Sequence, residues 1–198
     1  GIEIFRGLKK SGYKLITDIH EISQVEKIAE VVDVIQIPAF LCRQTDLIKE
    51  ACRAGKPLNI KKGQFLSPDQ MKNIIEKCNN FGNDQVMLCE RGTSFGYDNL
   101  IVDMLGISKM KSFNCPVVFD VTHSLQLPGQ GKKAAGGRGD KAEDLAKAGV
   151  SIGIAGLFVE VHPNPKEALC DGPSATSLYE FENLLEKVNA VDQAVKGF

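Results

Sequence analysis

The sequence predicts an α/β protein built on a parallel sheet, and two observations lead to this fold class. First, six short apolar segments each end in polar or charged residues: ITDIHE (16–21), IQIPAF (35–40), NIKKGQF (59–65), MLCERG (87–92), FDVTHS (119–124) and LFVEVHP (157–163). Second, amphipathic stretches long enough for a crossover helix separate these segments. Strands that alternate with helices form a parallel sheet, and such sheets carry their functional groups at the carboxyl ends of the strands.

The elements can be assigned in chain order. Strands are expected at residues 14–20, 34–38, 58–62, 85–90, 116–122 and 153–161. Helices are expected at residues 2–11, 22–31, 43–54, 68–79, 98–111, 140–148 and 177–195. Ser67 and Pro68 are favoured at an N-cap and at the first helical position, so they predict the start of helix 68–79. Gly55 suits the left-handed residue that ends a helix, which places the end of helix 43–54.

The number of strands favours a (β/α)8 TIM barrel over an open doubly wound sheet. A TIM barrel closes with eight parallel strands, whereas six are predicted here and the chain begins within a helix. An open sheet of the dinucleotide-binding type has a Gly-rich phosphate turn after its first strand, and the sequence has none. We therefore expect residues 1–198 to form a single TIM-barrel domain with about six βα units present and one or two N-terminal units missing.

Composition agrees with a soluble enzyme and predicts neither a nucleic-acid nor a membrane partner. The 198 residues are 43% hydrophobic and 25% charged, and the net charge of −1 provides no basic field for nucleic acid. No apolar run reaches the ~18 residues that a membrane span needs. The six cysteines form no C-x-x-C pair, which favours reduced thiols over a disulfide framework or a zinc site. We expect a cytoplasmic protein.

Strand alternation groups the polar strand ends into one candidate site. In residues 157–161 the leucine and the two valines share one face, which leaves Phe158 and Glu160 on the face directed into the barrel. The same alternation assigns four further strand-end residues to such a site: Asp18, Lys61, Arg91 and His123. Charged groups inside a barrel are costly to desolvate unless they have partners or a charged ligand. A structural ion-pair network is the alternative to a ligand site.

Several segments resemble one enzyme family, in the same order and along the whole chain. They are PAF (38–40) followed by RQTD (43–46), NIKKGQF (59–65), CERGTSFGYDNLIVDM (89–104), PVVFDVTHSLQ (116–126), GLFVEVHPNP (156–165) and CDGPSA (170–175). Together they closely resemble the 3-deoxy-D-manno-octulosonate 8-phosphate synthases. Synthases that make a seven-carbon heptulosonate phosphate share the architecture, but the CDGPS and FDVTHS runs are similar to the eight-carbon enzymes.

The resemblance implies a transferase of lipopolysaccharide biosynthesis. Its reaction condenses phosphoenolpyruvate with D-arabinose 5-phosphate and water to give 3-deoxy-D-manno-octulosonate 8-phosphate and phosphate, and the family typically assembles as a homotetramer. Two phosphorylated anions must be held close together, so cations should dominate binding. Two other interpretations stay open: a non-catalytic barrel fragment or oligomerisation module, and a metal-dependent aldolase that does not need phosphoenolpyruvate.

Two cations match the positions that, in this family, grip the phosphate and carboxylate of phosphoenolpyruvate. They are Lys61, which we also count among the catalytic residues, and Arg91. A guanidinium suits either anion because it can bind both oxygens at once. The alternative for Arg91 is a structural ion pair with Glu90 or Asp98.

Five further residues match the surroundings of that pocket. Ala39 and Phe40 resemble its lining, and Gln64 is expected beside them. Arg43 resembles a residue that reaches the site of a neighbouring subunit, with a solvated surface charge as the alternative. Asp18 matches a residue at the pocket edge that orients Lys61 or a water, and a structural partnership with Lys61 is the alternative.

A second cluster consists of His123, Glu160 and Asp171. A histidine with two carboxylates either holds a divalent metal or supplies acid, base and hydroxyl-binding groups around the sugar aldehyde. The family divides along this line, and the first-strand residue that separates its two branches is not in this chain. The run 170–174 resembles the metal-free branch, so we expect no cofactor, with a divalent metal as the alternative. His123 and Asp171 would then contact the sugar and polarise its carbonyl, with Glu160 orienting them.

The loop 125–139 is rich in glycine and basic residues, including Lys132, Lys133 and Arg138. It suggests a lid over an anionic substrate, and the alternative is a basic surface loop without a catalytic role.

Overall fold

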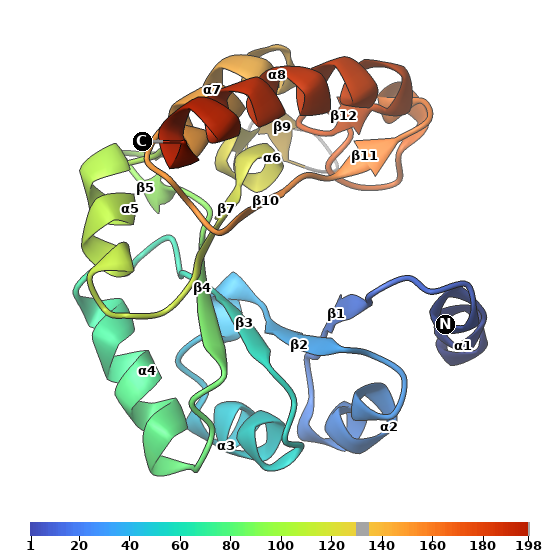
Figure 1. Cartoon of the computed structure of the whole chain (residues 1–198), viewed down its shortest axis with the longest axis vertical. Coiled ribbons are helices and arrows are strands. Elements are labelled where there is room, and N and C mark those ends of the chain that lie inside the picture. The colour runs from blue at the N-terminus through green and yellow to red at the C-terminus, as the bar shows by residue number, and fades with distance from the viewer. Residues whose placement is uncertain (130–134, 198) are drawn as a thin grey trace.

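A curved parallel sheet organises the chain. The computed structural model describes residues 1–129 and 135–197. Its six-stranded sheet follows the chain order: β1 (Ile16–Asp18), β2 (Val34–Ile37), β3 (Leu58–Lys61), β4 (Val86–Glu90), β7 (Val117–Asp120) and β10 (Gly156–Phe158). Every neighbouring pair of these strands is parallel. Figure 1 shows the sheet curled into an open arc with helices along its outer side, which confirms the predicted fold class of a partial TIM barrel.

Helices cover the outer side of the arc (Figure 1). They are α2 (Val25–Ala29), α3 (Thr45–Arg53), α4 (Gln70–Asn80), α5 (Met104–Lys111), α7 (Ala142–Val150) and α8 (Leu178–Lys196). Two further helices are α1 (Ile2–Lys10), which precedes β1, and α6 (Val121–Ser124), a single turn at the carboxyl end of β7. Within residues 1–129 and 135–197, none of them combines the length and apolar character needed to cross a membrane. All six cysteines are free thiols, as the sequence predicts.

Short strands and 3-10 turns follow the carboxyl ends of the sheet strands. Three strand pairs lie outside it: β5 (Thr93–Ser94) with β6 (Leu100–Ile101), β8 (Gln126–Leu127) with β9 (Gly136–Gly137), and β11 (Val161–His162) with β12 (Thr176–Ser177). Among the described residues, four 3-10 turns occur at Ile22–Gln24, Ala39–Leu41, Gly139–Lys141 and Pro165–Glu167. Residues 130–134, where the loop prediction places Lys132 and Lys133, lie outside the described residues.

The hydrophobic core lies between the sheet and the outer helices. Ile35, Ile37 and Ile60 are fully buried in it, and they alternate along their strands with Gln36 and Asn59. The amide of Asn59 donates to Gln36 Oε1 at 2.7 Å, so these polar side chains form a ladder on the other face. The period of two that the sequence predicts is therefore present, with apolar residues outward and polar residues toward the barrel interior.

The predicted helix 98–111 is too long at its start. Residues 93–101 instead form the hairpin of β5 and β6, and α5 begins at Met104 with the Asp103 side chain accepting from Leu105 N at 3.0 Å. The turn contains Gly96 at φ 66° and Asp98 at φ 55°. Left-handed backbone at these positions is incompatible with a right-handed helix, which is why the helix starts later.

The predicted strands 116–122 and 153–161 are also too long. β7 ends at Asp120, whose carboxylate accepts from His123 N at 3.0 Å and so caps the single turn of α6. His123 therefore lies in a helical turn and not in the strand, so the strand alternation used to assign it to the site is wrong. β10 ends at Phe158, so Glu160 follows the strand rather than ending it.

Candidate active site

Polar side chains gather at the carboxyl ends of the central strands. Lys61 is the last residue of β3 and Asp120 the last of β7, while Arg91 directly follows β4. The register places Lys61 beside Cys89 and Asp120 beside Phe158 on neighbouring strands. Parallel strands bring their carboxyl ends to the same rim, so these groups share one site.

Lys61 and Asp120 form a buried ion pair at the centre of this site. Lys61 Nζ lies 2.6 Å from Asp120 Oδ2 and 3.9 Å from the centroid of the Phe158 ring. His123 Nδ1 lies 2.9 Å from the same carboxylate oxygen. Burial alone would raise the pKa of Asp120, but the hydrogen bond from His123 and the charge of Lys61 outweigh it and lower that pKa. The carboxylate thus holds both the ammonium and the imidazole in place.

Asp120 was not among the residues predicted from the sequence. The signal was present, because Asp120 is the polar residue that ends an apolar strand. The alternative of a structural ion pair between Asp18 and Lys61 is wrong, since Asp18 accepts instead from the side-chain amide of Gln36, while its role at the pocket edge stays a prediction. The reason is the strand order, which places β1 two strands away from β3.

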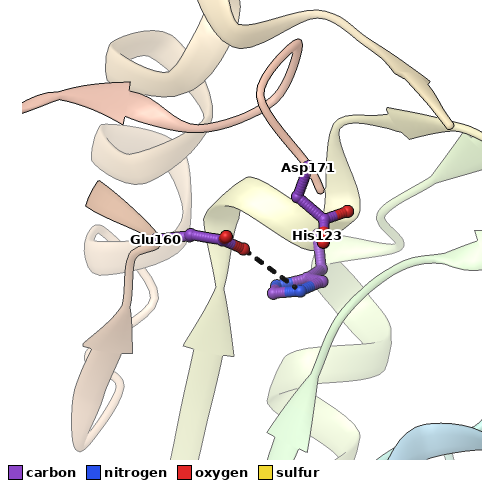
Figure 2. Close-up of side chains that lie close together, drawn as sticks. All are labelled: His123, Glu160 and Asp171. Atoms are coloured by element: carbon purple, nitrogen blue, oxygen red, sulfur yellow. Dashed lines mark ion pairs between the residues drawn. The ribbon is translucent and has the colours of Figure 1, made fainter. Parts of the chain in front are cut away.

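The structure brings His123, Glu160 and Asp171 together, as the sequence predicts (Figure 2). Their nearest ligand atoms lie within 4.8 Å of one another, and His123 Nε2 is 3.5 Å from Glu160 Oε2. The predicted inward face of Phe158 is confirmed as well, because its ring lies 5.7 Å from the His123 ring between centroids. Burial raises the pKa of Glu160, and the negative charges of Asp171 and Asp120 raise it further. His123 acts in the opposite direction and lowers this pKa, but it does not cancel the rise.

Arg91 is a buried cation without an ionic partner. Its residue is 5% exposed, and no carboxylate of residues 1–129 and 135–197 lies within ion-pair distance of its guanidinium. The alternative of an ion pair with Glu90 or Asp98 is wrong, since Glu90 pairs with Lys62 at 3.4 Å. Burial lowers the pKa of Arg91. A guanidinium buried in this way is suited to bind an anion.

Gln126 connects Arg91 with the second cluster. Arg91 Nη2 donates to Gln126 Oε1 at 2.6 Å, and Gln126 Nε2 donates to Asp171 Oδ1. Sequence reasoning missed this residue, although it ends the segment 116–126. Its contacts join positions 35 and 45 residues apart, so strand periodicity could not have identified it.

Comparison with known proteins identifies the family of this chain. Residues 2–197 match the DAHP synthetase I family. The chain belongs to the DAHP synthetase I family. It is 56% identical over 201 residues to the 2-dehydro-3-deoxyphosphooctonate aldolase of Glaesserella parasuis serovar 5 (strain SH0165), covering 100% of this chain and 71% of that relative. The same name and the same figures apply to the relative from Pasteurella multocida (strain Pm70). The relative from Shewanella halifaxensis (strain HAW-EB4) is 53% identical over 199 residues, with the same coverage.

The remaining predicted residues of this family member lie around the same rim. Ala39 is buried in the turn after β2, and Phe40 beside it is 70% exposed. Gln64 follows β3, and its backbone carbonyl accepts from Ser94 N at 2.9 Å. Arg43 is exposed in the turn that precedes α3. Their positions are compatible with the predicted roles, which stay predictions.

The donor set of the second cluster fits a divalent metal. One imidazole nitrogen and two carboxylates are ligands that borderline and hard divalent ions accept. Asp171 adopts the left-handed conformation with φ 55°, and Figure 2 shows its carboxylate beside His123. The same three side chains also suit acid–base work at a carbonyl, so the geometry accommodates both predicted uses.

Proposed function

We propose that this protein condenses phosphoenolpyruvate with D-arabinose 5-phosphate and water, giving 3-deoxy-D-manno-octulosonate 8-phosphate and inorganic phosphate. The observation that carries the proposal is Arg91, a buried guanidinium without an ionic partner in the described residues, on the same strand-end rim as Lys61 and the His123 cluster. A site built to receive two anions needs such uncompensated cations. The name of the relatives and the matching segments from residue 38 to residue 175 support the same reaction.

In the anion-binding half, Arg91 and Lys61 hold phosphoenolpyruvate. Arg91 binds the phosphate or the carboxylate through two donors, which fixes the orientation of the enol. Lys61 is held against Phe158 and Asp120, so its ammonium presents a single position to the ligand. Ala39, Phe40 and Gln64 line the neighbouring part of the pocket. This arrangement places C3 of the enol near the sugar carbonyl, which lowers the entropic part of the barrier.

In the aldehyde half, His123 and Asp171 contact the sugar. Nδ1 of His123 contacts the Asp120 carboxylate, so Nε2 is the ring nitrogen that faces Glu160 and the substrate. The electrons of the C2=C3 double bond form the new bond from C3 to the aldehyde carbon. His123 polarises the carbonyl oxygen, and Glu160 orients the imidazole. The oxygen of water bonds to C2, and one proton of that water goes to the former carbonyl oxygen. The bond from C2 to the phosphate oxygen then breaks, so that C2 becomes a ketone and phosphate leaves with the second proton.

We further propose that the enzyme works without a resident metal. The run from Cys170 to Ser174 supports this, because it resembles the metal-free branch. The alternative is a divalent metal on His123, Glu160 and Asp171, which the ligand distances also allow. Elemental analysis of protein purified without chelator separates the two. Stoichiometric metal, with activity abolished by chelation and restored by divalent ions, would contradict the metal-free proposal.

The assembly proposed for this protein is a cytoplasmic homotetramer that serves lipopolysaccharide biosynthesis. Exposed aromatic side chains near the site support self-association: Phe40, Phe65, Phe95 and Tyr97. Arg43 is exposed close to them, as a residue that reaches a neighbouring subunit must be. Analytical ultracentrifugation tests this assembly, and a monomer at micromolar concentration would contradict it.

Phosphate release measured with both substrates tests the proposed reaction. We expect release to require phosphoenolpyruvate and arabinose 5-phosphate together, and mass spectrometry to identify the eight-carbon product. His123→Ala should lose at least about a hundredfold in kcat, the usual loss for a group that assists proton transfer. His20→Ala is the matched control, because His20 is exposed and outside the cluster. Release of phosphate without the sugar, or full activity of His123→Ala, would contradict the proposal.

A further inference from the structure

The side-chain amide of Gln126 bridges a cation and an anion, and its orientation follows from their chemistry. A guanidinium can only donate hydrogen bonds and a carboxylate can only accept them. The amide oxygen therefore faces Arg91 and the amide nitrogen faces Asp171, as the two hydrogen bonds show. The neutral amide thus makes one hydrogen bond to each of the two charged groups.

The backbone that carries Gln126 is held by close packing. Gln126 pairs with Gly137 in the antiparallel pair of β8 and β9, and Gly139 N donates to Pro173 O at 3.0 Å. A Cβ on Gly137 would lie 2.6 Å from the backbone of Pro173 and Ser174, so this strand packs directly on the turn that carries Asp171. The segment of Gln126 and the turn of Asp171 thus form one packed unit, and the side chain extends from a fixed base.

The neutrality of this bridge has an electrostatic consequence. Within hydrogen-bond distance of Arg91, a carboxylate in place of the amide would neutralise the guanidinium, because charges interact strongly at a site shielded from water. The amide instead keeps Asp171 from pairing with Arg91 directly. Arg91 Nη1 has no hydrogen-bond partner within residues 1–129 and 135–197, so its donors stay available.

We infer that Gln126 is a positioning residue, which orients Arg91 through a neutral hydrogen bond and keeps the guanidinium charge free for the anionic group of the substrate. The inference rests on the proposed function in that Arg91 binds the phosphate or carboxylate of a substrate. It goes further because it gives the Gln126 amide a second task, which is to keep the Asp171 carboxylate apart from Arg91. Gln126 acts through Arg91 and need not touch the substrate.

The first test uses Gln126→Met, which keeps the length of the side chain and removes both hydrogen bonds. Calorimetry with inorganic phosphate as the probe, on the full chain, should show a threefold to tenfold weaker Kd. This is about the effect of one ordinary hydrogen bond, because Gln126 acts on the phosphate only through Arg91. The melting temperature should change little. In an Arg91→Met background the same substitution should leave the remaining phosphate affinity within about twofold, because residues that act through one another are not additive.

The second test uses Gln126→Glu, which has nearly the same shape but adds a charge. The new carboxylate pairs with Arg91, so phosphate affinity should fall by at least about tenfold and by more than in Gln126→Met. Gln85→Glu is the matched control. Gln85 is exposed just before the amino end of β4, the strand that Arg91 follows at its other end, and the same added charge there should leave phosphate affinity unchanged.

Three results would overturn the inference. They are an unchanged phosphate Kd in Gln126→Met, an equal loss from Gln126→Met with and without Arg91, and an unchanged Kd in Gln126→Glu. Turnover with both substrates is measured separately on the wild-type protein. Absence of turnover contradicts the proposed reaction, whereas phosphate affinity alone decides the role of Gln126, so the two failures are distinguishable.

Discussion

The ammonium of Lys61 lies 2.6 Å from the carboxylate of Asp120, and these side chains are 8% and 0% exposed. The same carboxylate also holds His123. One buried anion therefore positions a cation of the phosphoenolpyruvate half and the imidazole of the aldehyde half. Removing one partner of a buried pair leaves the other charge uncompensated, which is more costly than losing a surface ion pair.

Asp120→Asn should therefore lower both stability and activity. We expect the free energy of unfolding at pH 7 to fall by about 3–5 kcal/mol, as for other broken buried pairs. Since the folded-state pKa of Asp120 lies below its ordinary value of 3.8, its contribution is present above that value and is lost as the pH falls through the folded pKa. Urea unfolding from pH 7 to pH 3 should show less acid destabilisation in Asp120→Asn than in the wild-type protein. Parallel curves for the two proteins would contradict this coupling.

Arg91→Ala should mainly weaken phosphoenolpyruvate binding. Loss of a charge-assisted bidentate contact costs on the order of a few kcal/mol, so the Kd measured by calorimetry should rise at least about tenfold. Arg91→Lys should recover only part of the affinity, because an ammonium cannot bind two oxygens in a fixed plane. Arg53→Ala serves as the control, since Arg53 forms an exposed pair with Glu50. Full affinity in Arg91→Ala would refute the assignment.

The positions of several site residues could be predicted because the strand period of two governs them. Lys61 shares a face with Asn59, and Phe158 points inward toward His123, as alternation requires. The positions of Lys61 and Arg91 at strand ends follow from the same pattern. These predictions needed only local sequence.

Other parts of the site depend on contacts that local patterns do not contain. His123 lies in a helical turn because Asp120 caps it, and interpreting residues 116–122 as a strand cannot show that cap. Gln126 was missed because Arg91 and Asp171, its partners, come from distant segments. The hairpin at residues 93–101 turns at residues with left-handed backbone conformation, which the apolar spacing of a helix does not reveal.

Two glycines in helices should respond to alanine in opposite directions. A Cβ on Gly149 of α7 would lie 2.2 Å from the Phe119 ring on β7, so Gly149→Ala should destabilise the protein by about 1–3 kcal/mol through overpacking. A Cβ on Gly7 of α1 would meet no atom of the described residues within 4 Å, so Gly7→Ala should stabilise by about 0.5–1 kcal/mol through helix propensity. Thermal unfolding of both variants compares them. Equal shifts of the melting temperature would contradict this account of the α7 contact.

Lys62 and Glu90 form a second buried pair, on the core side of β3 and β4. Lys62 is 0% exposed and lies 3.4 Å from Glu90, and Glu90 accepts from Arg91 N and Gly92 N at 3.0 and 2.7 Å. Lys62→Met should lower the free energy of unfolding at pH 7 by about 3–5 kcal/mol, because it leaves the carboxylate buried and unpaired.

The pH dependence of Lys62→Met distinguishes this electrostatic cause from lost packing. Burial already raises the folded-state pKa of Glu90 above its ordinary value of 4.5, and Lys62 opposes that rise. A raised carboxyl pKa means that the folded state binds the proton more tightly, so stability falls as the pH rises from 4.5 through the folded pKa. Without Lys62 this window extends to higher pH, so the deficit of Lys62→Met should grow as the pH rises from 4.5 to 7. Urea unfolding across that range measures it, with Lys14→Met at an exposed pair as the control. A deficit that is the same at every pH would show that lost packing, rather than the uncompensated Glu90 charge, destabilises the variant.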